Sequence, residues 1–236
     1  MTQPAARPRA RAAAPEGLSD LGLEAELAAS GVASVIGMDE VGRGCTAGPV
    51  GVGAVRFDLA RLLAEPVTAG IRDSKQLRPA ARLAADRAVR AWQPHSAVAY
   101  AQPAEIDALG LSLALCLAGR RCLAALPPAD LVLLDGSFDW LGRPLTLDAH
   151  AVFDSAAAEV GVPPVRTFVK GDGWLVTIAA ASVIAKVARD ELMAGLAARF
   201  PGYGWESNAG YPSPVHKAAV ASLGPTPWHR RSFRLV

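Results

Sequence analysis

The decisive stretch of the chain is residues 34–44, with the sequence SVIGMDEVGRG. Its first five residues are small or apolar, which predicts a short buried strand over residues 34–38. This strand delivers two carboxylates, Asp39 and Glu40, at its end. Residues 42–44, Gly-Arg-Gly, follow, and their glycines let the backbone approach a ligand while the arginine can pair with a phosphate. A tight turn without a ligand would have the same composition, so the triplet alone is a weak signal.

Two further acids follow apolar strands elsewhere in the chain, Asp135 and Asp172. Ligands of α/β sheets bind beyond the carboxyl ends of strands, so these acids and the Asp39-Glu40 pair can converge. Carboxylates held together repel one another unless a cation shares the site. Oxygen ligands favour Mg²⁺ or Mn²⁺ over zinc, and two such ions roughly 4 Å apart activate a water and stabilise the leaving oxygen of a phosphodiester. A cap or turn role for each acid is the alternative.

Composition limits the kinds of partner that the chain can attract. The chain has 236 residues, of which 51% are hydrophobic, so a sizeable core can form. Its formal net charge is only +2. Residues 1–16 hold Arg7, Arg9 and Arg11 against Glu16, a balance of +2, which leaves zero for the rest. A nucleic-acid site must therefore be a local basic patch.

The cysteines and the apolar runs indicate a compartment. Cys45, Cys116 and Cys122 are an odd number without a Cys-x-x-Cys pair, which is typical of a reducing cytoplasm and disfavours disulfides and structural zinc. The longest strongly apolar uncharged run, residues 173–185, is shorter than the roughly 20 residues that span a bilayer. No apolar segment of a secretory signal follows the N-terminal arginines. We expect a soluble cytoplasmic protein with no membrane partner.

Strands alternate with helices after an initial pair of strands, which predicts an α/β domain with a mixed sheet. Residues 1–16 are rich in Ala, Pro and Arg without an apolar face, and we expect a disordered tail there. The expected strands are residues 34–38, 50–57, 95–101, 131–134 and 165–169, and the expected helices are residues 18–30, 78–92, one or two between 101 and 126, 177–199 and 214–223.

Several short blocks of the sequence, taken in order, resemble the ribonuclease HII family. They extend from about residue 33 to the end of the chain, and their agreement in order is a far stronger signal than any one of them. The blocks are GMDEVGRG at 37–44, AGPV at 47–50, DSKQL at 73–77, DG at 135–136, KGD at 170–172, IAAASVIAKVARD at 178–190, GYP at 210–212 and HRRSF at 229–233.

The resemblance implies a ribonuclease H-like fold, α/β with a central mixed sheet flanked by helices and a small C-terminal helical part. By this comparison residues 17–200 are the catalytic domain and residues 201–236 a helical substrate-binding part. It also implies an endonuclease that hydrolyses the 5′ side of a ribonucleotide, in RNA·DNA hybrids and in DNA duplexes with embedded ribonucleotides. The ends left are 3′-hydroxyl and 5′-phosphate, and the cofactors are two Mg²⁺ or Mn²⁺ ions.

The resemblance further implies which residues hold the metal ions. Asp190 competes with Asp172 as the fourth acid. It stands four residues after Lys186 inside the long helix, where a surface ion pair is expected, so Asp172 is preferred. The implied metal ligands are Asp39, Glu40, Asp135 and Asp172.

Substrate-binding residues are implied in the same way. The Gly42-Arg43-Gly44 backbone would contact the 2′-hydroxyl, which distinguishes RNA from DNA. Tyr211 would stack on the deoxyribose beyond the ribonucleotide, although a packed loop aromatic is the alternative. Ser74 and Lys75 would contact backbone phosphates.

Other positions have weaker or no family support. Family members often carry His-Lys where this chain has Asn208-Ala209. Residues 137–164 have no counterpart to which a role can be assigned. The C-terminal arginines could add phosphate contacts, but a charge run is more often solvated. These arginines are Arg230, Arg231 and Arg234.

Three other functions are less consistent with the sequence. A metal-free ribonuclease needs an acid–base pair, usually histidines, and only one histidine lies in a matching block. Ribonuclease HIII carries an additional N-terminal domain, for which the 38 residues before Asp39 leave little room. A non-catalytic binding module would not need the acids. We expect a monomer. The histidines are His95, His150, His216 and His229.

Overall fold

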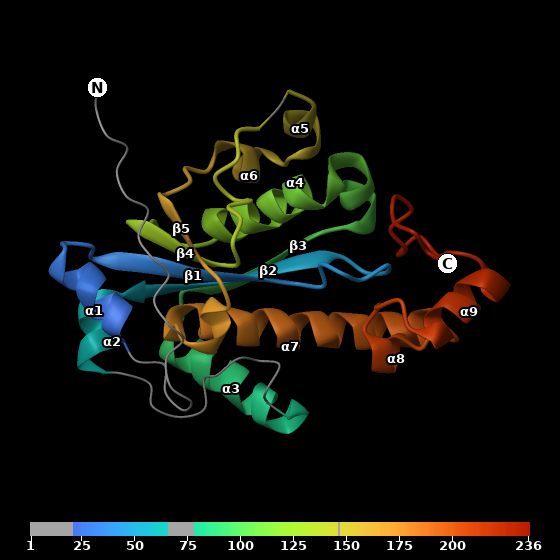
Figure 1. Ribbon diagram of the computed structural model, residues 1–236, viewed down its shortest axis with the longest axis horizontal. Coiled ribbons are helices and arrows are strands. Elements are labelled where there is room, and N and C mark those ends of the chain that lie inside the picture. Colours follow the sequence, from blue (N-terminus) through green and yellow to red (C-terminus); the bar gives the residue numbers. More distant parts are fainter. Residues whose placement is uncertain (1–20, 66–77, 146) are drawn as a thin grey trace, which may run out of the picture.

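The computed structural model describes residues 21–65, 78–145 and 147–236. Its centre is a five-stranded sheet in the order β3-β2-β1-β4-β5 (Figure 1). The first three strands pair antiparallel, whereas β4 runs parallel to β1 and β5 parallel to β4. The mixed sheet predicted from the sequence is confirmed. The strands are β1 (Ser34–Val41), β2 (Val50–Asp58), β3 (Ser96–Ala101), β4 (Leu131–Asp135) and β5 (Val165–Phe168).

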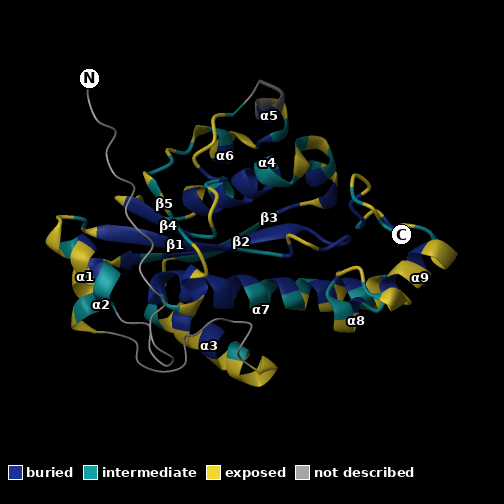
Figure 2. Ribbon diagram, viewed as in Figure 1, coloured by how far each residue is buried: buried dark blue, intermediate teal, exposed yellow. Residues whose placement is uncertain are grey.

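Two long helices cover opposite faces of the sheet, α4 (Pro103–Ala124) and α7 (Val176–Arg199) (Figure 1). Successive side chains of a strand point to opposite faces, so β1 contributes to both cores. Ile36 and Met38 pack with residues of α4, and Val35 packs with residues of α7. The three central strands, β1, β2 and β4, are therefore the most deeply buried part of the sheet (Figure 2).

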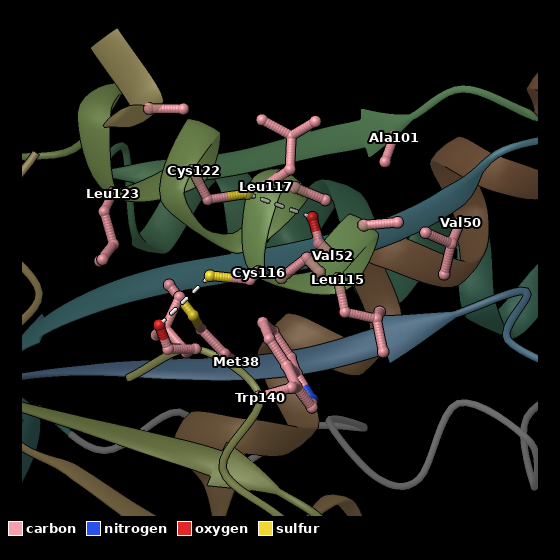
Figure 3. Close-up of a cluster of buried hydrophobic side chains, with 14 of the residues drawn as sticks. Met38, Val50, Val52, Ala101, Leu115, Cys116, Leu117, Cys122, Leu123 and Trp140 are labelled. Atoms are coloured by element: carbon pink, nitrogen blue, oxygen red, sulfur yellow. Dashed lines mark hydrogen bonds between the residues drawn. The ribbon is translucent and has the colours of Figure 1, made fainter. Parts of the chain in front are cut away.

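The core beneath α4 uses cysteines as small apolar residues. Figure 3 shows the Cys122 thiol directed at the Val52 carbonyl of β2, with a sulfur–oxygen distance of 3.2 Å. The Cys116 thiol donates to the Leu141 carbonyl at 3.4 Å. Trp140, 1% exposed, fills the space between the helix and the sheet. Residues from the otherwise unassigned stretch 137–164 thus complete this core.

α7 lies unusually close to the sheet because two strand residues facing it are glycines. A Cβ atom added at Gly37 would stand 2.1 Å from the Thr177 carbonyl oxygen, and one at Gly53 would stand 2.3 Å from that of Ala181. Any side chain at either position would push the helix away. The close approach brings the first half of α7 against the strand that carries Asp39.

Several short helices were not predicted from the sequence. Four- to six-residue helices are too short to show an apolar period, although Asp58 and Asp154 mark two of them as N-caps. The missed helices are α2 (Leu59–Ala64), α5 (Leu147–Val152), α6 (Ser155–Glu159) and α8 (Trp205–Asn208). The remaining helices are α1 (Gly22–Ala29), α3 (Pro79–Trp92), the 3-10 turn η1 (Gly171–Gly173) and α9 (Pro214–Leu223).

The predicted end of the first strand was wrong by three residues. β1 continues to Val41, so Asp39 and Glu40 lie within the strand and not after it. The reason is that β1 keeps its pairing with β2 as far as Val41 and Gly51, whereas its pairing with β4 stops at Met38. One edge of the strand is thus free where the carboxylates begin.

The C-terminal part interlocks with the loop that joins β1 to β2. Ala47 forms an isolated antiparallel bridge with His229, and the Gly48 amide donates to the Trp228 carbonyl at 2.8 Å. The amides of Thr46 and Ala47 both donate to the Gly210 carbonyl. The proposed boundary at residue 200 stays a prediction. Across the described ranges, no helix combines the length and the apolar character that a membrane crossing requires.

Candidate active site

Three aspartates converge at the carboxyl edge of the sheet. Asp39, Asp135 and Asp172 each place one carboxylate oxygen within 4.8 Å of the others. The β1–β4 ladder explains the first pair, because its last partners are Met38 and Leu134 and the next residue on each parallel strand is an aspartate. Asp172 comes from η1, just after β5. The sequence predicted this convergence from acids that follow separate strands.

Main-chain hydrogen bonds orient the second aspartate. The Asp135 carboxylate accepts from the Gly171 amide at 2.7 Å and from the Asp172 amide at 3.4 Å. Lys170 makes this turn possible by adopting a left-handed conformation, with φ of 55°. The turn therefore connects Asp135 directly to the residue that supplies the third carboxylate.

The cluster holds negative charge that burial disfavours. Asp39 is 5% exposed and Asp172 is 4% exposed. Burial, followed by repulsion from Asp135, Glu40 and Asp172, raises the pKa of Asp39 well above its usual value, against a hydrogen bond from Ser182. Burial and the Asp172 charge likewise raise the pKa of Asp135, against the two amides that it accepts from. Both shifts indicate a site that lacks positive charge of its own.

Glu40 stands beside this cluster with one oxygen unsatisfied. Its Oε1 accepts from the Arg43 guanidinium at 3.3 Å, across a turn of three residues. Its Oε2 is buried and has no hydrogen-bond partner within the described part of the chain. A buried carboxylate oxygen without a donor is costly, and a divalent cation is the kind of ligand that removes this cost. The donor set is all oxygen, which fits Mg²⁺ or Mn²⁺.

Asp190 lies in an ion-paired surface cluster. The Lys186 ammonium contacts its Oδ1 at 2.5 Å, and the Arg82 guanidinium contacts its Oδ2 at 3.4 Å. The ion pair predicted from the four-residue spacing is confirmed, and the contact from Arg82 on α3 is an addition. Both oxygens of Asp190 are thus engaged, in contrast to Glu40.

The turn after β1 lies beside Tyr211, far away in the sequence. Arg43 and Gly44 are exposed, whereas Gly42 is buried with φ of 78°. A Cβ atom at Gly44 would stand 3.6 Å from the Tyr211 ring, which is 47% exposed. The structure thus places this pair of predicted substrate-binding elements side by side on the surface. Ser74 and Lys75 fall outside the described residues.

Asn208 fixes the turn that precedes Tyr211. Its side-chain amide donates to the Tyr203 carbonyl at 2.9 Å and to the Ser213 hydroxyl at 3.3 Å, and its oxygen accepts from the Gly210 amide at 2.8 Å. The departure from the family's usual residues therefore has a structural role. Sequence reasoning missed this role, although an asparagine two residues before a glycine is a known turn signal.

A buried histidine pair supports the main chain of Tyr211. His216 Nδ1 lies 2.8 Å from the Tyr211 carbonyl oxygen, so this nitrogen must carry a proton. His216 Nε2 then accepts, from Trp205 Nε1 at 3.1 Å and from His229 Nε2 at 3.1 Å. His229 Nδ1 accepts in turn from the Thr226 amide. Both rings are neutral in this network, and neither is exposed by more than 1%.

Two arginines were missed or misjudged from the sequence. Arg230 was expected to contact phosphates or water, but it is fully buried, at 0% exposure. Arg189, on α7, was not singled out and is 1% exposed. Neither an Arg-Arg pair nor an arginine on an Ala-rich helix has a local sequence pattern that indicates burial. The burial of Arg230 and Arg189 therefore could not be predicted from the sequence. Arg231 and Arg234 are exposed, and their phosphate contacts stay a prediction.

The fold is that of the ribonuclease H-like hydrolases. A crystal structure of ribonuclease H2 from Pyrococcus horikoshii superposes with a TM-score of 0.64 at 26% identity, over 86% of this chain and 94% of that one. The ribonuclease HII family model matches residues 36–236. Ribonuclease HII of Streptomyces avermitilis is 45% identical over 207 residues, 87% of this chain and 79% of that protein. Ribonuclease HII of Ruegeria sp. is 45% identical over 218 residues, 92% of this chain and 85% of that protein. The chain belongs to the ribonuclease HII family and is an enzyme of the ribonuclease H type.

Proposed function

We propose that this enzyme hydrolyses the phosphodiester on the 5′ side of ribonucleotides, leaving 3′-hydroxyl and 5′-phosphate ends. Its substrates are RNA·DNA hybrids and DNA duplexes with embedded ribonucleotides, and its cellular use is the removal of such ribonucleotides from DNA. One observation carries the proposal. An acid cluster suited to phosphodiester hydrolysis lies next in the chain to a surface turn, residues 42–44, whose backbone and neighbouring Tyr211 suit recognition of a sugar.

Two divalent cations, Mg²⁺ or Mn²⁺, are the proposed cofactors. Their ligands would be the carboxylates of Asp39, Glu40, Asp135 and Asp172. The raised pKa values of Asp39 and Asp135 support this assignment, as does the partnerless buried oxygen of Glu40. Bound there, the cations would supply a nucleophilic water and stabilise the leaving oxygen of an in-line displacement.

The chain itself orients these carboxylates before any ligand binds. The Ser182 side chain bonds Asp39, and the amides of Gly171 and Asp172 hold Asp135. A carboxylate that is already fixed loses little freedom when it becomes a ligand, so its affinity for the cation is higher. The Arg43 guanidinium restrains Glu40 in a similar way.

Recognition of the ribonucleotide is assigned to the turn and to Tyr211. The 2′-hydroxyl is what distinguishes RNA from DNA, and main-chain amides can donate to its oxygen. Arg43 and Gly44 are exposed next to the Tyr211 ring, which can stack on the neighbouring deoxyribose. Ser74 and Lys75 are proposed to contact backbone phosphates. These contacts would place the scissile bond at the RNA–DNA junction.

A metal-free mechanism is less well supported. It needs two accessible groups that exchange protons with the substrate. His216 and His229 are buried and engaged with one another, so neither can reach a substrate. The acids, by contrast, form a cluster that a polyanion would avoid without cations.

The test uses an end-labelled DNA duplex with one embedded ribonucleotide, incubated with Mg²⁺ or Mn²⁺. An all-DNA duplex, an Asp39→Asn variant and a matched Asp190→Asn variant are the controls. We expect cleavage only on the 5′ side of the ribonucleotide, abolished by a chelator and in Asp39→Asn but retained in Asp190→Asn. A duplex that is bound but never cut would indicate a binding module. Cleavage that survives the chelator would exclude the carboxylate–metal mechanism.

A further inference from the structure

Two buried arginines lie beneath the loop of residues 42–49, and neither forms an ion pair with a carboxylate of the described residues. Arg189 and Arg230 are 1% and 0% exposed. No salt bridge joins either guanidinium to an acid among the residues that the structure describes. Burial of a charge without a counter-ion is rare and costly, so the protein must offer these groups other partners.

The partners of Arg230 are main-chain carbonyls of the loop. Its Nη2 donates to the Gly42 carbonyl at 2.7 Å, its Nη1 to the Arg43 carbonyl at 3.1 Å and its Nε to the Gly48 carbonyl at 2.9 Å. One rigid guanidinium fork thus binds both ends of the loop. Hydrogen bonds from a charged donor are stronger than neutral ones, so this arrangement restrains the backbone firmly.

Arg189 supports the same loop from the side of α7. It donates to the carbonyls of Ala47, Pro49 and Ala209, at 3.3, 3.1 and 2.9 Å. A Cβ atom at Gly42 would stand 2.1 Å from its Nε, so the Gly42 backbone lies directly against the guanidinium. The loop is therefore held between two cationic side chains that come from distant parts of the chain.

The two carbonyls bound by Arg230 determine where the neighbouring amides point. In a planar trans peptide, the carbonyl and the following N–H point in opposite directions. The Gly42 carbonyl shares its peptide with the Arg43 amide, and the Arg43 carbonyl shares its peptide with the Gly44 amide. The described chain contains no cis peptide bond. With both carbonyls drawn toward the buried guanidinium, both amides face away from it, on the exposed side of the turn.

We propose that Arg230 is a positioning residue for ribonucleotide recognition. By holding the carbonyls of Gly42 and Arg43 in the interior, it presents the amides of Arg43 and Gly44 as a fixed pair of donors for the 2′-oxygen. This inference rests on the proposed function, which assigns the turn to that hydroxyl. A donor pair fixed in advance discriminates well because binding does not have to order the loop. Lysine could not replace the arginine, since its single ammonium cannot hold three carbonyls in a fixed fork.

The test measures selectivity, which a loss of folded protein does not change. All variants are made in the Asp39→Asn protein, which prevents cleavage of the substrate. Fluorescence anisotropy with Mg²⁺ then gives the Kd for a duplex with one ribonucleotide and the Kd for an all-DNA duplex of the same sequence. The quantity of interest is the selectivity, defined as the Kd for the all-DNA duplex divided by the Kd for the one-ribonucleotide duplex. We expect Arg230→Lys to lower this selectivity about fivefold to tenfold, the effect of weakening a hydrogen bond or two. A partly unfolded sample would raise both Kd values and leave the ratio unchanged.

Arg121→Lys is the matched control. Arg121 also donates to a main-chain carbonyl, that of Tyr100 at 2.6 Å, but it lies on α4 away from the turn. Its substitution should leave the ratio unchanged. If the background protein with Arg230 intact shows no ribonucleotide preference, the proposed function fails. If that preference exists and survives in Arg230→Lys, the positioning role alone is overturned.

A measurement with Arg230 intact covers the case in which Arg230→Lys does not fold. In the Asp39→Asn protein, the backbone amide NMR signals of Arg43 and Gly44 should shift when the one-ribonucleotide duplex is added. The all-DNA duplex should leave both signals closer to their positions in the free protein. Equal shifts with the two duplexes would overturn the proposal, because the amides would then not detect the 2′-oxygen.

Discussion

The acid cluster and the buried arginine pair both concentrate like charges, but their charges are compensated differently. Asp39, Asp135 and Asp172 bring like charges together, and the pKa values of the first two are raised. Arg189 and Arg230 also bring like charges together, and burial, with a smaller contribution from repulsion by Arg189, lowers the pKa of Arg230 to about 10. The two arginines, however, donate hydrogen bonds to six main-chain carbonyls.

The difference lies in whether the protein itself satisfies the charges. The arginines direct their hydrogen bonds to main-chain carbonyls of the chain itself, so these charges stabilise structure. In the acidic site, by contrast, Glu40 has a buried carboxylate oxygen without a hydrogen-bond partner in the described chain, which is the expected state of a ligand-binding group. A like-charge cluster that is satisfied internally fixes a loop, and one that is not satisfied indicates a binding site.

Asp39→Asn should have the largest effect and should separate function from stability. We expect the cleavage rate to fall on the order of 10³-fold, since a ligand and a charge are lost at the reacting centre. In the absence of metal, however, the Asp39→Asn variant should melt at a higher temperature than the native protein. The folded-state pKa of Asp39 lies above its unfolded value, so its charge costs stability as pH rises through the folded pKa. Calorimetry with a chelator at neutral pH measures this, and a lower Tm would contradict the account.

Arg189→Ala should be the largest loss of stability. Three carbonyls lose a charged donor in a buried site, so the free energy of unfolding should fall by about 3–5 kcal/mol. Urea denaturation measures the change. Arg61→Ala is the control, because its contact with Glu65 joins two side chains that are 57% and 69% exposed. A loss below about 1 kcal/mol at Arg189 would refute the structural role given to this arginine.

Acid should weaken the C-terminal part through the histidine pair. Burial and repulsion from His216 lower the pKa of His229 to about 4 from 6.5. A histidine with a lowered folded-state pKa contributes stability that is complete above the unfolded pKa and is lost as pH falls from 6.5 toward 4. We expect about 2 kcal/mol of this contribution to disappear by pH 5.

The effect of the histidines on the pH dependence of stability must be separated from that of the acids, because protonation of the acids stabilises the folded protein as pH falls. Comparing the native protein with His229→Gln at each pH does this, because the acid cluster is common to both. The difference in unfolding free energy should narrow as pH falls below 6.5. A difference that stays constant down to pH 5 would show that the pair does not titrate in this range.

Asp107→Ala should have the smallest effect of the four. Asp107, on α4, accepts from the Ser232 amide at 2.8 Å, the Ser232 hydroxyl at 2.6 Å and the Arg231 amide at 2.9 Å. Loss of these partly exposed bonds should cost about 1 kcal/mol, measured by urea denaturation. Glu65→Ala is the control, and it should lower the free energy of unfolding by less, because Glu65 is exposed. Cleavage should stay within about twofold of native, and a larger loss would mean that the C-terminal segment acts on the turn more directly.

Much of the site could be predicted because its acids obey local rules. Asp39 and Asp135 each come directly after a run of apolar residues, and neighbouring parallel strands bring such positions to a common edge of a sheet. Asp172 was assigned by the family resemblance and by its place after an apolar strand, and the helical spacing of Asp190 from Lys186 argued against Asp190. The structure places Asp172 in the cluster and Asp190 in an ion pair. Local patterns, together with the family resemblance, therefore predicted these positions.

The arginines could not be found by such patterns. Whether an arginine is buried depends on carbonyls that are distant in sequence, and Gly42 lies 188 positions from Arg230. The end of β1 was missed for a related reason, because it depends on which neighbouring strand stops first. Short capped helices such as α2 lack the length that shows a period. What escaped prediction was decided by tertiary contacts and not by the local sequence.

The most direct test of the central claim is a calorimetric titration with Mn²⁺ of the native protein, Asp172→Asn and Asp190→Asn. We predict that the native protein and Asp190→Asn bind Mn²⁺ alike, and that Asp172→Asn binds about tenfold more weakly or worse. No binding to the native protein, or loss of binding in Asp190→Asn alone, would contradict the assignment of the acid cluster as the metal site.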